Sequence, residues 1–242
     1  MLAIAFEGCA CRAAFHAGVA AGLSEAKVTF TLAAGTSSGS LCAAGVAAGR
    51  AAELPGVFRG LAGRSVVSLR RALWNRSPFD MSHLVRSTLR QVLGAGDLRE
   101  GPGEALVMAT RVRDLRPLCF SSRAEPDLVE PLLGSCFFPV LYGRTVQVRG
   151  ELLLDGGFTD NLPLEALRAR GATEIIASVI SPQGTARKDL WRPRWRPLVH
   201  GAKVHVIHPR ALLELRSWEL HQGRLERALD EGYARAREFT GG

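Results

Sequence analysis

The 242-residue sequence has no apolar run long enough to cross a bilayer, which takes about 18 residues or more. Its first residues carry no basic cluster and reach an acidic residue at Glu7, so they do not resemble a secretory signal. The five cysteines show no C-x-x-C pair, which disfavours a disulfide framework and a zinc site. Motifs of nucleic-acid-binding domains are also missing. We therefore expect a cytoplasmic protein with reduced thiols, no metal or other cofactor, and no nucleic-acid partner.

Lysine is scarce and arginine abundant, and the formal net charge is +8. This charge describes the electrostatic field of the protein and not its fold. It fits an anionic membrane surface, acidic metabolites or solubility alone. Apolar residues make up 47% of the chain and charged residues 22%, which is the composition of an ordinary globular protein. A single domain spanning residues 1–242 is expected at this length.

Strand and helix patterns alternate near the start of the chain. The apolar runs Leu2–Phe6 and Val28–Ala34 have strand length, and each precedes a helical pattern, at Ala14–Leu23 and after Leu41. This alternation predicts an α/β fold with a mostly parallel sheet and helices on both faces. Loops at the carboxyl ends of such strands line the ligand crevice.

The remaining elements are predicted in the same way. We expect helices at Ser68–Trp74, Met81–Leu93, Glu130–Gly134, Leu164–Arg170 and Trp218–Phe239, and strands at Ala105–Thr110, Leu118–Ser122, Ile175–Ile180 and Val204–Ile207. The helical region before residue 99 is interpreted either as a lid or side wall of a site or as ordinary packing on the sheet.

The stretch Gly35-Thr36-Ser37-Ser38-Gly39 joins the second strand to its helix. A G-x-S-x-G sequence in this context is typical of a nucleophile elbow, whose strained turn lifts the serine clear of the sheet. Glycines on either side let neighbouring backbone come close. Ser37 is the serine centred in this frame and the candidate nucleophile. Taken alone, the motif is equally well explained as a glycine-serine turn with a serine N-cap.

A second polar stretch, Asp155-Gly156-Gly157, follows an apolar strand. Asp-Gly is a common hairpin signal. Here, however, a polar loop and a helix follow instead of a partner strand, which favours a site role for Asp155. Asp160 and Asn161 are interpreted as turn and cap residues.

A serine triad would need a late histidine as its base. The candidates are His200, His205, His208 and His221. His205 lies within an apolar strand and is better explained by packing, whereas His208 stands at a strand end where a catalytic histidine fits. No acid-plus-histidine pattern surrounds any of them.

Together these motifs resemble the patatin-like phospholipases. The resemblance is carried, in the family's order, by Glu7–Ala13 with Ala17-Gly18-Val19, Gly35–Gly39, Ser135–Pro139, Asp155–Gly157 and Asp160–Pro163. It implies a three-layer α/β/α fold and a dyad of Ser37 as nucleophile and Asp155 as base, without histidine. It also implies hydrolysis of phospholipid or other acyl esters through an acyl-enzyme, with Gly156 and Gly157 allowing close approach to the base.

The resemblance further implies an oxyanion hole built from backbone N–H groups of one loop, with Ser38 as a further donor. The residues of this loop are Gly8, Cys9, Ala10, Cys11 and Arg12. The family has a run of glycines here, and this chain has Cys9, Ala10 and Ala13 at three glycine positions. Positive φ is uncommon for residues other than glycine, so the substitutions bear on catalytic strength. Cys9 and Cys11 are interpreted as inert packing residues or as redox-sensitive thiols.

Three functions share these motifs. The leading one is a serine lipid acyl hydrolase, followed by an acyltransferase or thioesterase with the same dyad and by a catalytically weak lipid-binding or regulatory protein.

The segment Arg187–Pro197 interleaves basic residues with Trp191 and Trp195. It predicts either a peripheral membrane contact with anionic lipid or a solvated loop. The sequence does not indicate an oligomeric state.

Overall fold

The computed structural model describes residues 1–63, 86, 88, 98–125, 127–139 and 145–241. The helices predicted at Ser68–Trp74 and Met81–Leu93 lie outside these residues, apart from the isolated positions 86 and 88. Among the described residues, no helix is both long and apolar enough to cross a membrane.

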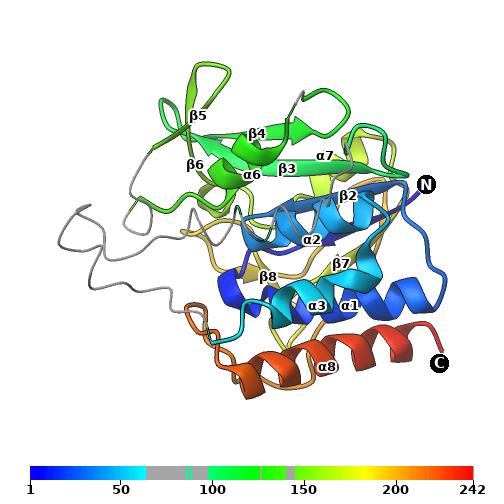
Figure 1. Cartoon of the computed structure of the whole chain (residues 1–242). Coiled ribbons are helices and arrows are strands. Elements are labelled where there is room, and N and C mark those ends of the chain that lie inside the picture. The colour runs from blue at the N-terminus through cyan, green and yellow to red at the C-terminus, as the bar shows by residue number, and fades with distance from the viewer. Residues whose placement is uncertain (64–85, 87, 89–97, 126, 140–144, 242) are drawn as a thin grey trace.

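A mixed eight-stranded sheet forms the centre of the molecule (Figure 1). Its order is β10-β7-β1-β2-β3-β6-β5, with β4 also paired to β3. The strands are β1 (Leu2–Phe6), β2 (Leu32–Thr36), β3 (Glu104–Arg111), β4 (Arg116–Ser121), β5 (Val146–Val148), β6 (Glu151–Asp155), β7 (Glu174–Ser178) and β10 (Lys203–Ile207). The strands from β10 to β3 pair in parallel, whereas β4, β5 and β6 pair antiparallel to their neighbours. The predicted α/β class with a mostly parallel sheet is confirmed.

Alternate residues of β1 enter two different cores. Ile4 and Phe6 belong to the core beneath the larger helical layer, and Ala3 and Ala5 to a smaller core on the opposite face. This alternation follows from the two-residue period of a strand. The helices of the larger layer are α1 (Ala13–Glu25), α2 (Ser38–Ala47), α3 (Leu54–Arg59), α6 (Val129–Ser135) and α8 (Gln222–Phe239), and α7 (Leu164–Ala169) covers the other face. The result is a three-layer α/β/α fold.

Two elements begin four residues later than predicted. The second strand begins at Leu32 instead of Val28, because residues 28–31 form the connection from α1 and alternate between half-buried and exposed positions. The last helix begins at Gln222 instead of Trp218, because Arg216–Glu219 forms a turn in which Glu219 N–H donates to Arg216 O at 3.2 Å. In addition, the short antiparallel pair β8 (Ala186–Arg187) and β9 (Arg194–Trp195), which was not predicted, lies between β7 and β10.

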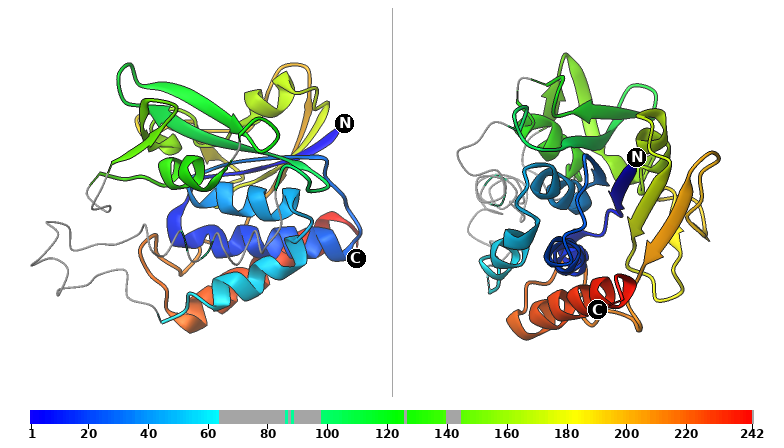
Figure 2. Two further views of the ribbon diagram at one scale, coloured as in Figure 1. Left: turned by 45° about the horizontal axis from the view of Figure 1, so that its top comes forward. Right: turned by 90° about the vertical axis from the view of Figure 1, so that its right-hand side faces the viewer.

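Helix α1 lies between α8 and the sheet, as both views in Figure 2 show. The contact between α1 and α8 requires a glycine on each helix. A Cβ atom added to Gly18 would lie 2.0 Å from the carbonyl oxygen of Leu229, and one added to Gly232 would lie 2.0 Å from that of Phe15. The backbones of α1 and α8 are therefore packed against each other without intervening side chains at this point.

Candidate active site

The turn between β2 and α2 has the geometry of an elbow. Ser37 has φ 54° and ψ −131°, a conformation that is costly for a residue with a side chain and is often found at functional sites. A Cβ atom at Gly35 would lie 2.3 Å from Gly39 O, and one at Gly39 would lie 2.6 Å from Phe6 O. The two glycines are needed because the turn folds against itself and against the end of β1.

The Ser37 hydroxyl lies beside the carboxylate of Asp155, near enough to act on the pKa of that carboxyl. The two residues are brought together by β3, which lies between their strands and pairs Met108 with Thr36 and Ala109 with Asp155. The Ser37 N–H donates to Ser135 Oγ at 2.8 Å. The backbone of the elbow is thus fixed by Ser135.

Asp155 ends β6 and is followed by a one-turn 3-10 helix, Gly156–Phe158, instead of a hairpin strand. Its side chain accepts the N–H of Gly157 at 2.8 Å, and the residue is 9% exposed. Burial raises the pKa of the Asp155 carboxyl from 3.8 to about 6, although the hydrogen bonds from Ser37 and Gly157 act in the opposite direction. The carboxylate is consequently a stronger base than a solvated aspartate and is still largely ionised at neutral pH.

Among the described residues, no histidine side chain is hydrogen-bonded to Ser37. His205 Nε2 lies 2.6 Å from Glu174 Oε1, and His208 Nδ1 lies 3.0 Å from Pro209 O. His16 is buried between Ser178 and Glu7 O, and burial lowers its pKa to about 3, so it is neutral. In the part of the chain that the structure describes, the elbow serine therefore has a carboxylate neighbour and no imidazole neighbour.

The loop predicted to form the oxyanion hole lies beside the elbow, but most of its N–H groups are already engaged. Gly8 N–H donates to Asn161 O at 3.0 Å, Cys9 N–H to Ser38 Oγ at 3.4 Å and Cys11 N–H to Ser217 O at 3.0 Å. Within the described residues, no acceptor is present for Ala10 N–H. Ala10 is the donor of this loop that is best placed to meet a ligand.

Asn161 connects the two halves of the site, a role that the sequence did not reveal. Its backbone oxygen accepts from Gly8 N–H, and its side-chain amide donates to Gly8 O at 3.1 Å. Its own N–H donates to Lys188 O at 2.7 Å. The residue was interpreted as a cap, whereas it joins the loop after β1 to the loop after β6. The sequence feature that could have indicated this role was the position of Asn161, six residues after Asp155.

Two further residues beside Ser37 were not singled out for a role. Ser135 Oγ accepts the Ser37 N–H and donates to Met108 O at 2.5 Å, so it ties the elbow to β3. The Cys136 thiol lies near the hydroxyls of Ser37 and Ser40, and its burial raises its pKa. Burial also raises the pKa of Cys9 to about 12 and that of Cys11 to about 11. Protonated thiols are poor nucleophiles, which favours the inert interpretation of these cysteines.

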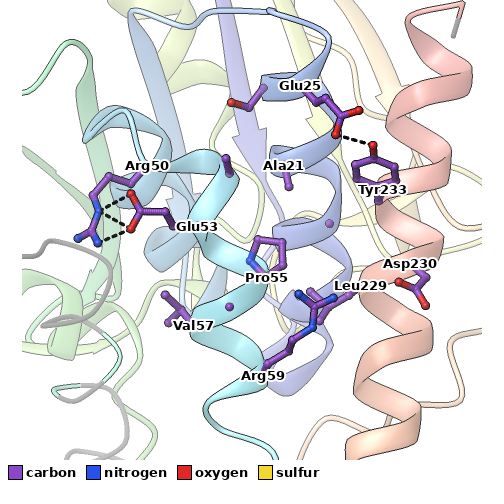
Figure 3. A pocket seen from close by; sticks show the side chains of 14 residues that line it. Ala21, Glu25, Arg50, Glu53, Pro55, Val57, Arg59, Leu229, Asp230 and Tyr233 are labelled. Carbon is purple, nitrogen blue, oxygen red and sulfur yellow. Dashed lines mark hydrogen bonds and ion pairs between the residues drawn. The ribbon is translucent and has the colours of Figure 1, made fainter.

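A groove of about 1150 Å³ lies elsewhere, between α1, α3 and α8 (Figure 3). Apolar residues such as Ala21, Val57 and Leu229 line it. Two pairs of its polar groups are drawn in Figure 3, Arg50 with Glu53 and Tyr233 with Glu25. Neither Ser37 nor Asp155 lines this groove, so the candidate site is placed at the elbow.

A family model described as patatin-like phospholipase matches residues 4–168. The chain belongs to this family. The match covers β1, the elbow and the Asp155 motif, so the predicted membership is confirmed on the segments that form the site.

Patatin-like relatives differ in length from this chain. Human patatin-like phospholipase domain-containing protein 2 is 29% identical over 179 residues, covering 68% of this chain and 34% of that protein. Mouse omega-hydroxyceramide transacylase is 36% identical over 85 residues, covering 34% of this chain and 14% of that protein. The chain thus spans about a third of the human relative. VipD from Legionella pneumophila shares the fold at a TM-score of 0.53 and 11% identity, covering 99% of this chain and 66% of VipD.

In the oxyanion loop, the three residues that replace glycines of the family differ in backbone conformation. Ala10 has φ 55°, in the left-handed region, whereas Ala13 has φ −62°, which any residue adopts. Cys9, at φ −155°, also lies outside the left-handed region. Of the three replacements, only Ala10 holds a conformation that glycine adopts more readily.

Ala10→Gly is therefore expected to stabilise the protein by about 1 kcal/mol, because it removes the left-handed strain of an L-residue. Ala13→Gly is the matched control. Ala13 is the first residue of helix α1 and is buried, so a change to glycine there is expected to destabilise the protein by about 1 kcal/mol. Chemical denaturation of both variants measures the two effects. Equal destabilisation by both would contradict the assignment of strain to Ala10.

Proposed function

We propose that this chain is a serine lipid acyl hydrolase that cleaves carboxylic esters of phospholipids or simpler acyl lipids. The observation that carries the proposal is that the strained Ser37 stands beside the buried carboxylate of Asp155. Membership of the patatin-like phospholipase family supports a lipid ester as the substrate.

In the proposed reaction, Ser37 Oγ attacks the ester carbonyl carbon while Asp155 takes up the hydroxyl proton. Collapse of the tetrahedral intermediate breaks the ester C–O bond, and the departing alcohol receives the proton from Asp155. Water then attacks the acyl-enzyme, gives a proton to Asp155 and releases the fatty acid, and Ser37 recovers its proton. The raised pKa of Asp155, about 6, suits a group that both accepts and returns a proton near neutral pH.

The oxyanion is proposed to bind the N–H groups of Ala10 and Ser38. Ala10 N–H has no acceptor among the described residues, and Ser38 is the first residue of the ten-residue helix α2. The N–H groups and the dipole at a helix N-terminus favour negative charge. Gly8, Cys9 and Cys11 hold the loop in place through their own hydrogen bonds.

Acyl transfer is the second candidate, and it is favoured by the similarity to omega-hydroxyceramide transacylase. The same acyl-enzyme would then pass its acyl group to an alcohol instead of water. Adding an alcohol acceptor to the assay separates the two, because transfer gives a new ester and hydrolysis gives free fatty acid.

A fluorophosphonate probe tests the proposal directly. The wild-type protein is expected to be labelled on Ser37 and to release fatty acid from phospholipid or p-nitrophenyl ester substrates. Ser37→Ala is expected to lose the label completely and turnover by about 10⁴-fold or more. The neighbouring Ser40→Ala, which keeps the elbow serine, serves as the labelling control. A folded wild-type protein that takes up no probe would favour the lipid-binding interpretation.

A further inference from the structure

Large exposed apolar side chains gather near the candidate site. Leu190, Trp191, Leu212 and Trp218 are exposed by 42, 74, 80 and 71%. They belong to two loops, residues 188–193 and residues 210–220. In Figure 1 the loop before α8 lies at the end of the sheet toward which β1 and β2 run. Apolar groups exposed together at one end are typical of a contact surface.

The loop that carries Trp191 is ordered by a buried carboxylate. Asp189 Oδ1 accepts the N–H of Trp191 at 2.9 Å and that of Arg192 at 2.8 Å. The Trp191 ring lies 6.4 Å from that of Phe158, three residues after Asp155. The loop therefore holds the indole at the surface on the Asp155 side of the site.

The buried Glu7, which immediately precedes the oxyanion loop, anchors the chain that leads into this segment. Its carboxylate accepts the N–H of Ile180 and that of Arg187, each at 3.0 Å. Together with the bond from Asn161 N–H to Lys188 O at 2.7 Å, this fixes the position of the Trp191 loop relative to the site.

The loop that carries Trp218 is attached to the oxyanion loop. Ser217 O accepts the N–H of Cys11, within the oxyanion loop, at 3.0 Å. The turn from Arg216 to Glu219 places Trp218 outward, and Glu219 is fixed by an ion pair with Arg224 at 2.7 Å. Each exposed tryptophan is thus carried by a loop that contacts the loops of the candidate site.

Positive charge accompanies the indoles. Residues 187–196 include five basic residues and one acidic residue, Asp189, which is buried. Arg192 pairs with Asp189 at 3.3 Å and Arg194 with Glu7 at 3.8 Å, whereas the other three basic residues have no carboxylate within 4.0 Å among the described residues. Tryptophan favours the headgroup region of a bilayer, and arginine favours an anionic lipid surface. We propose that the loops of Trp191 and Trp218 form a membrane-docking surface that seats the site on an anionic phospholipid bilayer. This inference rests on the proposed function, which makes the substrate a lipid. Binding to the bilayer does not itself require turnover.

Vesicle flotation tests the docking surface. The full-length protein is expected to float with vesicles of phosphatidylcholine and phosphatidylglycerol, and much less with phosphatidylcholine alone or in high salt. Trp191→Ala/Trp218→Ala is expected to lower the partition coefficient at least about tenfold, because two exposed indoles no longer enter the interface. Leu190→Ala/Leu212→Ala is a second pair that is expected to weaken binding.

Leu198→Ala is the matched control, because Leu198 is 66% exposed but precedes β10 and so lies toward the opposite end of the sheet. It is expected to bind as the wild type does, and so is Ser37→Ala, which separates docking from catalysis. Thermal melts show that each variant is folded. Flotation of both double variants at the wild-type level would overturn the proposal, and so would a wild-type protein that stays in the aqueous fraction at every lipid composition.

Discussion

Asp155→Asn is expected to lower ester turnover by about 10³-fold and, at the same time, to make the protein more stable at neutral and alkaline pH. The loss of turnover follows from removing the proposed general base, a contribution of about 10²–10⁴-fold in enzymes. The gain in stability follows from removing a buried charge, since burial is the main cause of the raised pKa of Asp155.

The direction of the stability effect depends on pH. The pKa of Asp155 is about 6 in the folded protein and 3.8 as the reference value, so between these values the folded state binds more protons. Stability of the wild-type protein therefore falls as pH rises through this window. Above the folded pKa the full cost is reached, about 3 kcal/mol for a shift of this size. Below pH 3.8 the cost is absent.

Urea denaturation of both proteins at several pH values measures this effect. The stability difference between Asp155→Asn and the wild type is expected to be near zero at about pH 4 and to reach about 3 kcal/mol at about pH 8. Ser37→Ala is the control, because it is also expected to be inactive but keeps the buried carboxylate and hence the pH dependence. An Asp155→Asn protein whose stability parallels that of the wild type across this range would show that the carboxyl is not buried as a charge.

Gly232→Ala is expected to destabilise the fold by about 3 kcal/mol, equivalent to a melting temperature lower by about 10 °C. The added Cβ would lie 2.0 Å from Phe15 O and 3.0 Å from Val19 N. Both are backbone atoms of α1, which cannot move aside as a side chain can. Relief requires α8 to separate from α1 along their whole contact.

Gly223→Ala provides the comparison on the same helix. There the nearest atoms to an added Cβ are a guanidinium nitrogen of Arg227 and Cε1 of His221, each at 3.6 Å and each in a side chain. Because alanine favours helix over glycine, this variant is expected to be slightly more stable than the wild type, by about 0.5 kcal/mol. Calorimetry of the two variants measures the contrast. A similar small gain from both would show that α1 and α8 are not in backbone contact.

The fold was largely predictable because its parallel strands are short and almost wholly apolar. Leu2–Phe6 was predicted with the bounds that β1 has, and the strand–turn–helix at Ser37 was placed correctly as structure. The short strands β5, β8 and β9 were not predicted, since two or three residues carry no readable period. The start of β2 was placed four residues early because Val28 and Phe30 are apolar but belong to a connection.

The candidate site was only partly predictable. The catalytic roles of Ser37 and Asp155 stay predictions, and the structure adds that the two side chains meet. The contacts of Ser135 and Asn161 were missed because each depends on a partner about 100 or more positions away. Likewise, the sequence could not tell which N–H groups of the oxyanion loop are free, since their acceptors come from Ser38, Asn161 and Ser217.

The positions of these acceptors along the chain set the order in which the candidate site can assemble during synthesis. The elbow at Ser37 leaves the ribosome early, but its neighbour Asp155 follows much later, and Cys11 has to wait for Ser217. A nascent chain that has reached α7 carries the nucleophile and the base without a completed anion pocket. Such a chain lacks the bond from Cys11 N–H to Ser217 O, which anchors the proposed oxyanion loop from the C-terminal part of the sequence.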